Sequence, residues 1–134
     1  MGQQQLLLII LGVIIVGIAI AVGITMFSAG SVQSNKDAII NDLNNLAANA
    51  YQHRIRPASM GGGGGAYDAS LGGQAYTIPT KLLTNENASY VATVGGPDAI
   101  TFVATSVTYA GNTVTADLDA TGKLSNFVYA GTEF

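Results

Sequence analysis

The polar and apolar positions divide the chain into segments with different periodicity. The first is an uninterrupted apolar run, Leu6–Phe27, and no Lys, Arg, Asp or Glu occurs before Lys36. A helix over this run is roughly 33 Å long at a rise of 1.5 Å per residue, enough to cross the hydrocarbon core of a bilayer. The rest of the chain is too small to surround such a helix. We therefore expect lipid or other copies of the chain to cover it.

The residues on either side of the apolar run indicate that it is not removed as a signal peptide. A secretory signal peptide has a basic n-region followed by an apolar region of about 7–15 residues. Here Met1–Gln5 contains no basic residue, and the apolar run is longer than that. Ser28-Ala29-Gly30 has the small residues of a cleavage site, but its flanks do not match one. The sequence predicts an apolar helix over residues 1–31 that serves as a transmembrane helix.

Small residues reduce the bulk of this helix at several points. Ala19 and Gly23 are four residues apart, the spacing that lets two membrane helices approach closely. The alternative is that glycine is simply more frequent in membrane helices than in soluble ones. The spacing between Gly12, Gly17 and Gly23 defines no single contact line, so we expect contacts in several directions.

A helical period continues beyond the apolar run and predicts an amphipathic helix over residues 32–56. Pro57 disfavours helix at the residue before it and so sets the end. The apolar positions of this helix are Val32, Ile39, Ile40, Leu43, Leu46, Ala47 and Ala50. The polar positions opposite them are Lys36, Asp37, Asn41, Asp42, Asn44, Asn45 and Asn49.

Residues 57–73 have no periodicity and include five consecutive glycines, Gly61–Gly65. No Gly-Lys-Ser/Thr follows them, as a phosphate-binding loop requires, and no strand precedes them, as a dinucleotide site requires. We interpret the segment as a flexible crossover loop. The alternative is a bare backbone against which a neighbouring subunit packs.

Residues 74–134 are rich in Val, Thr, Tyr and Phe and predict an antiparallel β-domain. The expected strands are Tyr76–Ile78, Ser89–Val94, Ile100–Tyr109, Thr113–Leu118 and Leu124–Tyr129. Short turns join the last four, which indicates a meander. Alternation within Thr113–Leu118 gives the sheet one apolar face, and the amphipathic helix is the element available to cover it. The predicted class is α+β, with a long N-terminal helix packed on a small C-terminal antiparallel sheet.

Composition and residue inventory argue against an enzyme. The net charge of −3, with 10% charged residues, leaves no basic patch for nucleic acid. There is no cysteine, and His53, the one histidine, fits a helix end. Asp117-x-Asp119-x-Thr121 resembles the opening of a calcium loop, but its twelfth position is Val128 and not Glu. We expect no catalytic residue, no cofactor and no metal site.

In layout, the whole chain resembles a type IV pilin or pilin-like filament subunit. The resemblance rests on an uncharged apolar helix that continues into an amphipathic one, followed by a loop and an antiparallel sheet. It implies a subunit anchored in the inner membrane before assembly, and a pilus assembly machinery that delivers it to an extracellular, cell-surface filament of identical copies. The residues expected in the filament core are Leu6, Leu7, Ile10, Gly12, Val13, Gly17, Ala19, Ile20, Gly23, Met26 and Phe27.

The N-terminus departs from the family pattern. Family precursors carry a short basic leader ending in Gly, and the mature chain has Glu at its fifth position. Cleavage after Gly2 would place Leu7 there, and a mature start at Met1 would place Gln5 there. Neither supplies a carboxylate for the terminal amine. We expect the amides of Gln3, Gln4 and Gln5 to be the polar contacts of that amine.

Asn87-Ala88-Ser89 matches the glycosylation sequon, which makes Asn87 a candidate glycosylation site.

The alternative function is a single-pass membrane-anchored surface protein that displays a small β-domain. An anchor of that kind has no need of an apolar helix joined directly to a long amphipathic one.

Overall fold

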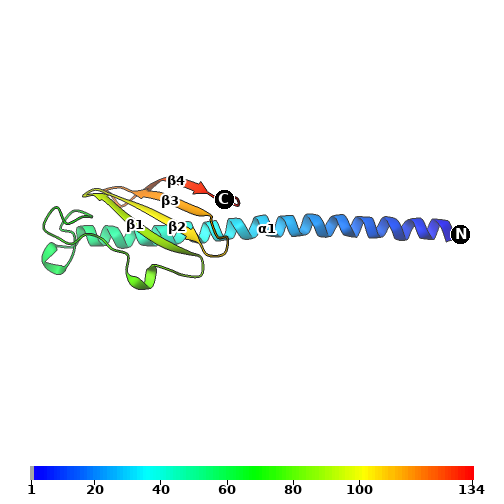
Figure 1. The fold of residues 1–134 in the computed structure, drawn as a ribbon, viewed down its shortest axis with the longest axis horizontal. Helices are drawn as coiled ribbons and strands as arrows, with labels where there is room; N and C mark the ends of the chain where they lie inside the picture. The colour runs from blue at the N-terminus through cyan, green and yellow to red at the C-terminus, as the bar shows by residue number, and fades with distance from the viewer. Residues whose placement is uncertain (1) are drawn as a thin grey trace. The chain divides into compact units, whose positions relative to one another are not determined.

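The computed structural model describes residues 2–134, which form two compact units. The first unit ends at Ser34, and the second comprises Asn35–Phe134. Helix α1 (Gly2–Ile55) is continuous in sequence through both (Figure 1). No proline occurs before Pro57, so every residue of α1 can contribute a backbone N–H to the helix. Met1, one of the two predicted N-termini, lies outside the described residues.

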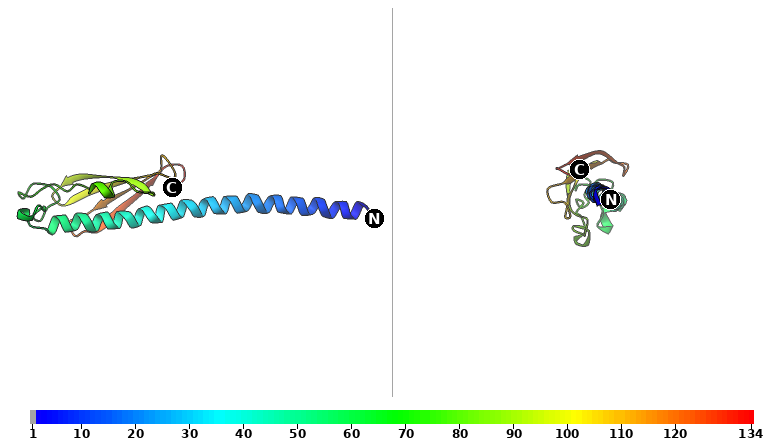
Figure 2. Two further views of the ribbon diagram at one scale, coloured as in Figure 1. Left: turned by 90° about the horizontal axis from the view of Figure 1, so that it is seen from below. Right: turned by 90° about the vertical axis from the view of Figure 1, so that its right-hand side faces the viewer.

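The second unit is an antiparallel sheet over the C-terminal part of α1. Its strands are β1 (Ala88–Gly96), β2 (Ala99–Ser106), β3 (Thr113–Leu118) and β4 (Leu124–Ala130). They pair in the order β1-β2-β3-β4, each antiparallel to the next. Residues 35–55 of α1 run along one face of this sheet (Figure 2). The predicted meander and the α+β class are confirmed.

The core of the second unit lies between the sheet and α1. Alternate residues of β3 are buried, and these are Val114, Ala116 and Leu118, as the sequence predicts. From α1, Leu43 is fully buried and Leu46 is 3% exposed. The remaining core members are Ile39, Ala47, Ala50, Tyr67, Tyr76, Ile78, Ala88, Tyr90, Ile100, Phe102 and Ala104.

Two predicted strands differ from the structure. Tyr76–Ile78 is not a strand, because its neighbour is a loop: the Tyr76 N–H donates to the carbonyl of Tyr67 at 2.7 Å. Tyr76 and Ile78 are nevertheless buried while Thr77 is exposed, so the alternation marks burial without a strand. The strand predicted to reach Tyr109 ends at Ser106, since the Tyr109 N–H turns back to the Ser106 hydroxyl at 3.0 Å.

The glycine-rich segment folds onto the end of α1. The N–H groups of Gly63, Gly64 and Gly65 donate to the carbonyls of His53, Arg56 and Arg54 at 2.7–2.9 Å. These are carbonyls that a helix end leaves without partners. A Cβ on Gly63 would lie 1.9 Å from the Ala66 carbonyl oxygen, so this close approach requires glycine. The segment predicted as a flexible crossover instead caps the helix.

Two short 3-10 helices complete the connections, η1 (Ala58–Met60) and η2 (Thr80–Leu82). One residue of β4, Asn126, has a positive φ of 53° and lies where the β3–β4 register shifts. Its amide donates to Asp117 at 3.2 Å, which ties this bulge to the neighbouring strand.

Candidate functional site

The first candidate site is the apolar surface of residues 6–27. Its large apolar side chains are exposed, from 48% at Ile10 to 79% at Phe27. A Cβ built on Gly12, Gly17 or Gly23 would meet no atom within 4 Å. α1 is long enough and apolar enough to cross a membrane, and signal sequences share these two properties. Within residues 2–134, nothing covers this surface.

The polar groups of this segment suit an apolar environment. Thr25 donates its hydroxyl to the carbonyl of Ala21 at 3.0 Å, one turn earlier in the helix. A hydroxyl that bonds within its own helix can enter lipid or a helix bundle without leaving a donor unpaired.

The predicted core residues all lie along this one exposed surface. They are Leu6, Leu7, Ile10, Gly12, Val13, Gly17, Ala19, Ile20, Gly23, Met26 and Phe27. A single chain brings none of them against a second helix, so their self-association stays a prediction. Gln3, Gln4 and Gln5 are exposed in the first turns of α1. The Met1 amine they are expected to contact lies outside the described residues.

A second candidate site surrounds Asp42, in the second unit. Its Oδ2 accepts three hydrogen bonds, from the Tyr90 hydroxyl at 2.6 Å and from the amides of Asn85 and Asn87 at 2.8 and 3.1 Å. Burial acts to raise the pKa of Asp42, but these hydrogen bonds outweigh it and lower the pKa below 3.8. The sequence groups Asp42 with the polar positions of the helix. In the structure its donors come from β1 and the loop before it, so this polar position is half-buried.

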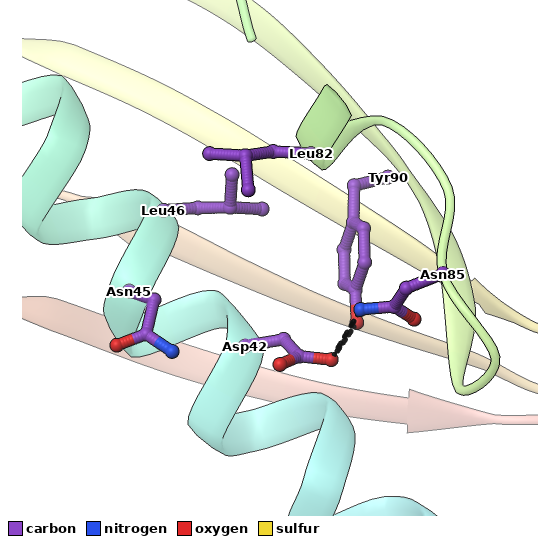
Figure 3. Close-up of a pocket in the computed structure, with 6 residues that line it drawn as sticks. All are labelled: Asp42, Asn45, Leu46, Leu82, Asn85 and Tyr90. Carbon is purple, nitrogen blue, oxygen red and sulfur yellow. Dashed lines mark hydrogen bonds between the residues drawn. The ribbon is translucent and has the colours of Figure 1, made fainter. Parts of the chain in front are cut away.

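A small cavity of about 70 Å³ lies beside this carboxylate (Figure 3). Asn45 and Leu46 line it from α1, Leu82 from η2, and Asn85 and Tyr90 from the loop and strand that follow. Leu46 and Leu82 form an apolar wall, and the polar groups gather around Asp42 (Figure 3). The cavity therefore combines a carboxylate with apolar walls.

Asn49 is a second polar position of the helix that contacts the rest of the domain. It is half-buried and accepts a hydrogen bond from the Tyr76 hydroxyl at 3.0 Å. Burial raises the pKa of Tyr76 to about 12. Asp42 and Asn49 thus form a polar margin between α1 and the elements that cover it.

Asn87 is held by several interactions. Its side chain donates to Asp42, and its carbonyl accepts the Val107 N–H at 3.1 Å. A glycan attached to its side-chain nitrogen would replace one of the two amide hydrogens of a group that bonds Asp42. Glycosylation at Asn87 stays a prediction.

Arg54, near the end of α1, joins two turns of the sheet. One guanidinium nitrogen lies 2.7 Å from Asp98, between β1 and β2, and the other donates to the Ala120 carbonyl, between β3 and β4, at 2.6 Å. The guanidinium also lies over the ring of Tyr67 at 5.4 Å. Arg54 therefore fixes the positions of these two turns relative to the end of α1.

A buried polar network lies at the other end of the sheet. Ser106 donates its hydroxyl to the side-chain oxygen of Asn35 at 2.8 Å, and the Ser106 N–H donates to the Asn112 carbonyl at 2.9 Å. Nearby, the ammonium of Lys36 lies 4.1 Å from the centre of the Tyr129 ring. These contacts fix where α1 meets β2 and β4.

The remaining polar candidates have structural partners. His53 Nε2 lies 2.6 Å from the Gln74 carbonyl, beside the ring of Tyr76. Asp119 accepts the N–H groups of Thr121 and Lys123, as a turn-forming Asp does. Among residues 2–134, no three His, Cys, Asp or Glu side chains are grouped so as to hold a metal ion.

Comparisons of the chain with protein-family models, with curated proteins and with solved structures find no match. The function therefore has to be argued from the fold and the sites. The fold defines a class: an α+β protein with a long, apolar N-terminal helix and a small antiparallel β-domain. This layout is compatible with a pilin-like subunit and with a membrane-anchored β-domain protein.

Proposed function

We propose that the chain is the structural subunit of an extracellular, type IV pilus-like helical filament, assembled through its N-terminal apolar helix. The observation that supports this most is the exposure of the whole Leu6–Phe27 surface in a helix whose later residues form the core of the β-domain. Such a surface requires lipid or copies of itself.

In this proposal the apolar segment has two successive environments. It anchors the subunit in the inner membrane and then packs against the same segment of neighbouring copies. Moving an apolar helix from lipid to a bundle of its own kind changes its apolar contacts little, so the hydrophobic term nearly cancels. Packing at small residues such as Gly17 and Gly23 then decides whether copies associate, and an assembly machinery in the membrane delivers the subunits to the filament.

A second candidate is a single-pass membrane protein that displays the β-domain as a monomer. The observation that favours it is the length of the uncharged segment, which suffices for one membrane crossing. In both candidates the role is structural and not catalytic.

Electron microscopy of the full-length protein separates the two candidates. The protein is purified in detergent, the detergent is removed, and the product is imaged with and without added lipid. The proposal predicts helical filaments without lipid. Particles that stay dispersed, or that insert singly into vesicles and form no filament, favour the membrane-anchored monomer.

A further inference from the structure

We propose that the cavity beside Asp42 binds a primary ammonium group carried on a short aliphatic stem, the chemistry of a lysine side chain or a small alkylamine. The proposal rests on the unequal use of the two Asp42 oxygens, on the apolar walls and on the size of the cavity.

The two oxygens of Asp42 have different surroundings. All three of its hydrogen bonds end on Oδ2. Oδ1 accepts no hydrogen bond from the described part of the chain, and it lies on the side of the carboxylate away from Tyr90 (Figure 3). No Lys, Arg or His among residues 2–134 forms an ion pair with Asp42. A half-buried carboxylate thus keeps one oxygen available for a cation.

The surroundings of Oδ1 select the kind of cation. A guanidinium binds a carboxylate best through both oxygens at once, and Oδ2 is already occupied by three donors. Calcium and magnesium take six or more oxygen ligands, whereas this cavity offers a single carboxylate. An ammonium is a compact charge that needs one carboxylate oxygen, and its other donors can bond a neutral acceptor such as the exposed side-chain amide of Asn45, which also lines the cavity.

The rest of the cavity fits an aliphatic stem. Leu46 is 3% exposed and Leu82 is 43% exposed, so the apolar wall extends from the interior to the surface. A volume of about 70 Å³ accommodates an ammonium and a few methylene groups, since roughly 10–15 Å³ of such volume already holds one water. Lysine stems commonly lie along apolar surface in this way.

Two sources can supply this group. One is a free alkylamine, and the other is a lysine of a second copy, which depends on the proposed filament. Lys36 lies over the Tyr129 ring, whereas Lys81 and Lys123 are exposed. Lys81 and Lys123 of a neighbouring copy are therefore the lysines that could enter the cavity.

The first experiment tests the chemistry and does not depend on filaments. The full chain, dispersed in an uncharged detergent, is titrated with n-butylammonium chloride, with n-butanol as the neutral match and sodium chloride as the salt control. NMR follows the side-chain amides of Asn45 and Asn85. We expect saturable shifts with n-butylammonium and binding at least about tenfold weaker with n-butanol.

Two variants complete this test. Asp42→Asn removes the charge and is expected to weaken amine binding at least about tenfold. Leu82→Phe narrows the cavity and leaves every donor to Asp42 in place, so it is expected to abolish binding without unfolding the chain. Equal affinity for n-butanol, or amine binding unchanged in both variants, would overturn the proposal.

The second experiment identifies the source in assembled filaments. If a lysine of a neighbouring copy occupies the cavity, wild-type filaments do not bind n-butylammonium, while filaments of Lys81→Met or Lys123→Met do. If a free amine is the ligand, wild-type filaments bind the probe as the dispersed chain does. A failure to form filaments counts against the proposed function and leaves the result of the first experiment intact.

Discussion

Nη2 of Arg54 lies 2.7 Å from Oδ1 of Asp98, and this contact fastens the end of α1 to the turn between β1 and β2. The two side chains are unequally exposed, 19% for Arg54 and 66% for Asp98. Arg54 also donates to the Ala120 carbonyl, and its guanidinium lies over the ring of Tyr67. The arginine therefore takes part in several contacts, and the aspartate contributes one of them at the surface.

This inequality predicts different costs for the two partners. Arg54→Met should lower the free energy of unfolding by about 2 kcal/mol, because it removes the hydrogen bond to Ala120 and the contact with Tyr67 as well as the ion pair. Asp98→Asn should cost less than about 1 kcal/mol, as exposed ion pairs do. Urea denaturation of both variants measures this. Equal losses would show that the ion pair, and not the buried contacts, makes the interaction important.

The Asp42 site predicts a specific pH dependence. Its pKa is lowered in the folded chain, so it contributes stability above its ordinary pKa of 3.8 and loses that contribution as pH falls through the folded value. Wild-type protein should be more stable than Asp42→Asn at pH 7, and the difference should shrink as pH falls from about 5 to about 2. Denaturation at a series of pH values tests this. A difference that is constant with pH would contradict the assignment.

The core of the β-domain predicts a large loss at Leu43. Its side chain is fully buried between α1 and the sheet, so Leu43→Ala should destabilise the domain by about 2–5 kcal/mol. The neighbouring Asn44 is exposed, and Asn44→Ala should change stability by less than about 0.5 kcal/mol. A loss at Leu43 as small as that at Asn44 would mean that this face of the helix is not covered by its own sheet.

The glycine-rich cap gives a prediction about backbone packing. Gly63→Ala should cost about 2 kcal/mol or more, because its Cβ would overlap the Ala66 carbonyl and disturb the bond to His53. Gly95→Ala is the matched control, since a Cβ there meets its nearest atom at 3.9 Å. Thermal unfolding of the two variants decides between a cap that needs glycine and a flexible linker. Equally small losses of thermal stability in the two variants would support a flexible linker.

Local patterns in the sequence suffice to predict most of the fold. Helical spacing from Val32 to Ala50 and the alternation in Thr113–Leu118 each record which side of an element is buried. The turns around Pro97 and Gly111 mark where strands end. Each of these signals involves residues close together in the chain, and the structure confirms the helix and the last four strands.

The contacts of the sites could not be predicted in this way. Asp42 and Tyr90 are far apart in sequence, as are Arg54 and Ala120, and their meeting depends on how loops cross the helix. Helical spacing identifies Asp42 only as a polar position of the helix. It does not show that a loop from elsewhere in the chain covers that position. The Asn-Glu-Asn sequence at 85–87 was the one available signal, since its amides supply two of the three donors.

If residues 6–27 hold copies of the chain together, Gly17→Arg should prevent filament assembly. Gly17 lies within this apolar surface, and an arginine there would place a charge inside the core of the filament. The matched control, Gly17→Ala, adds a methyl group where no atom lies within 4 Å in the single chain. Filaments are counted by electron microscopy, and NMR of the dispersed chains checks that the β-domain is folded. We expect filaments from wild-type and Gly17→Ala protein, and none from Gly17→Arg protein whose β-domain is folded. Normal filaments from Gly17→Arg would contradict it.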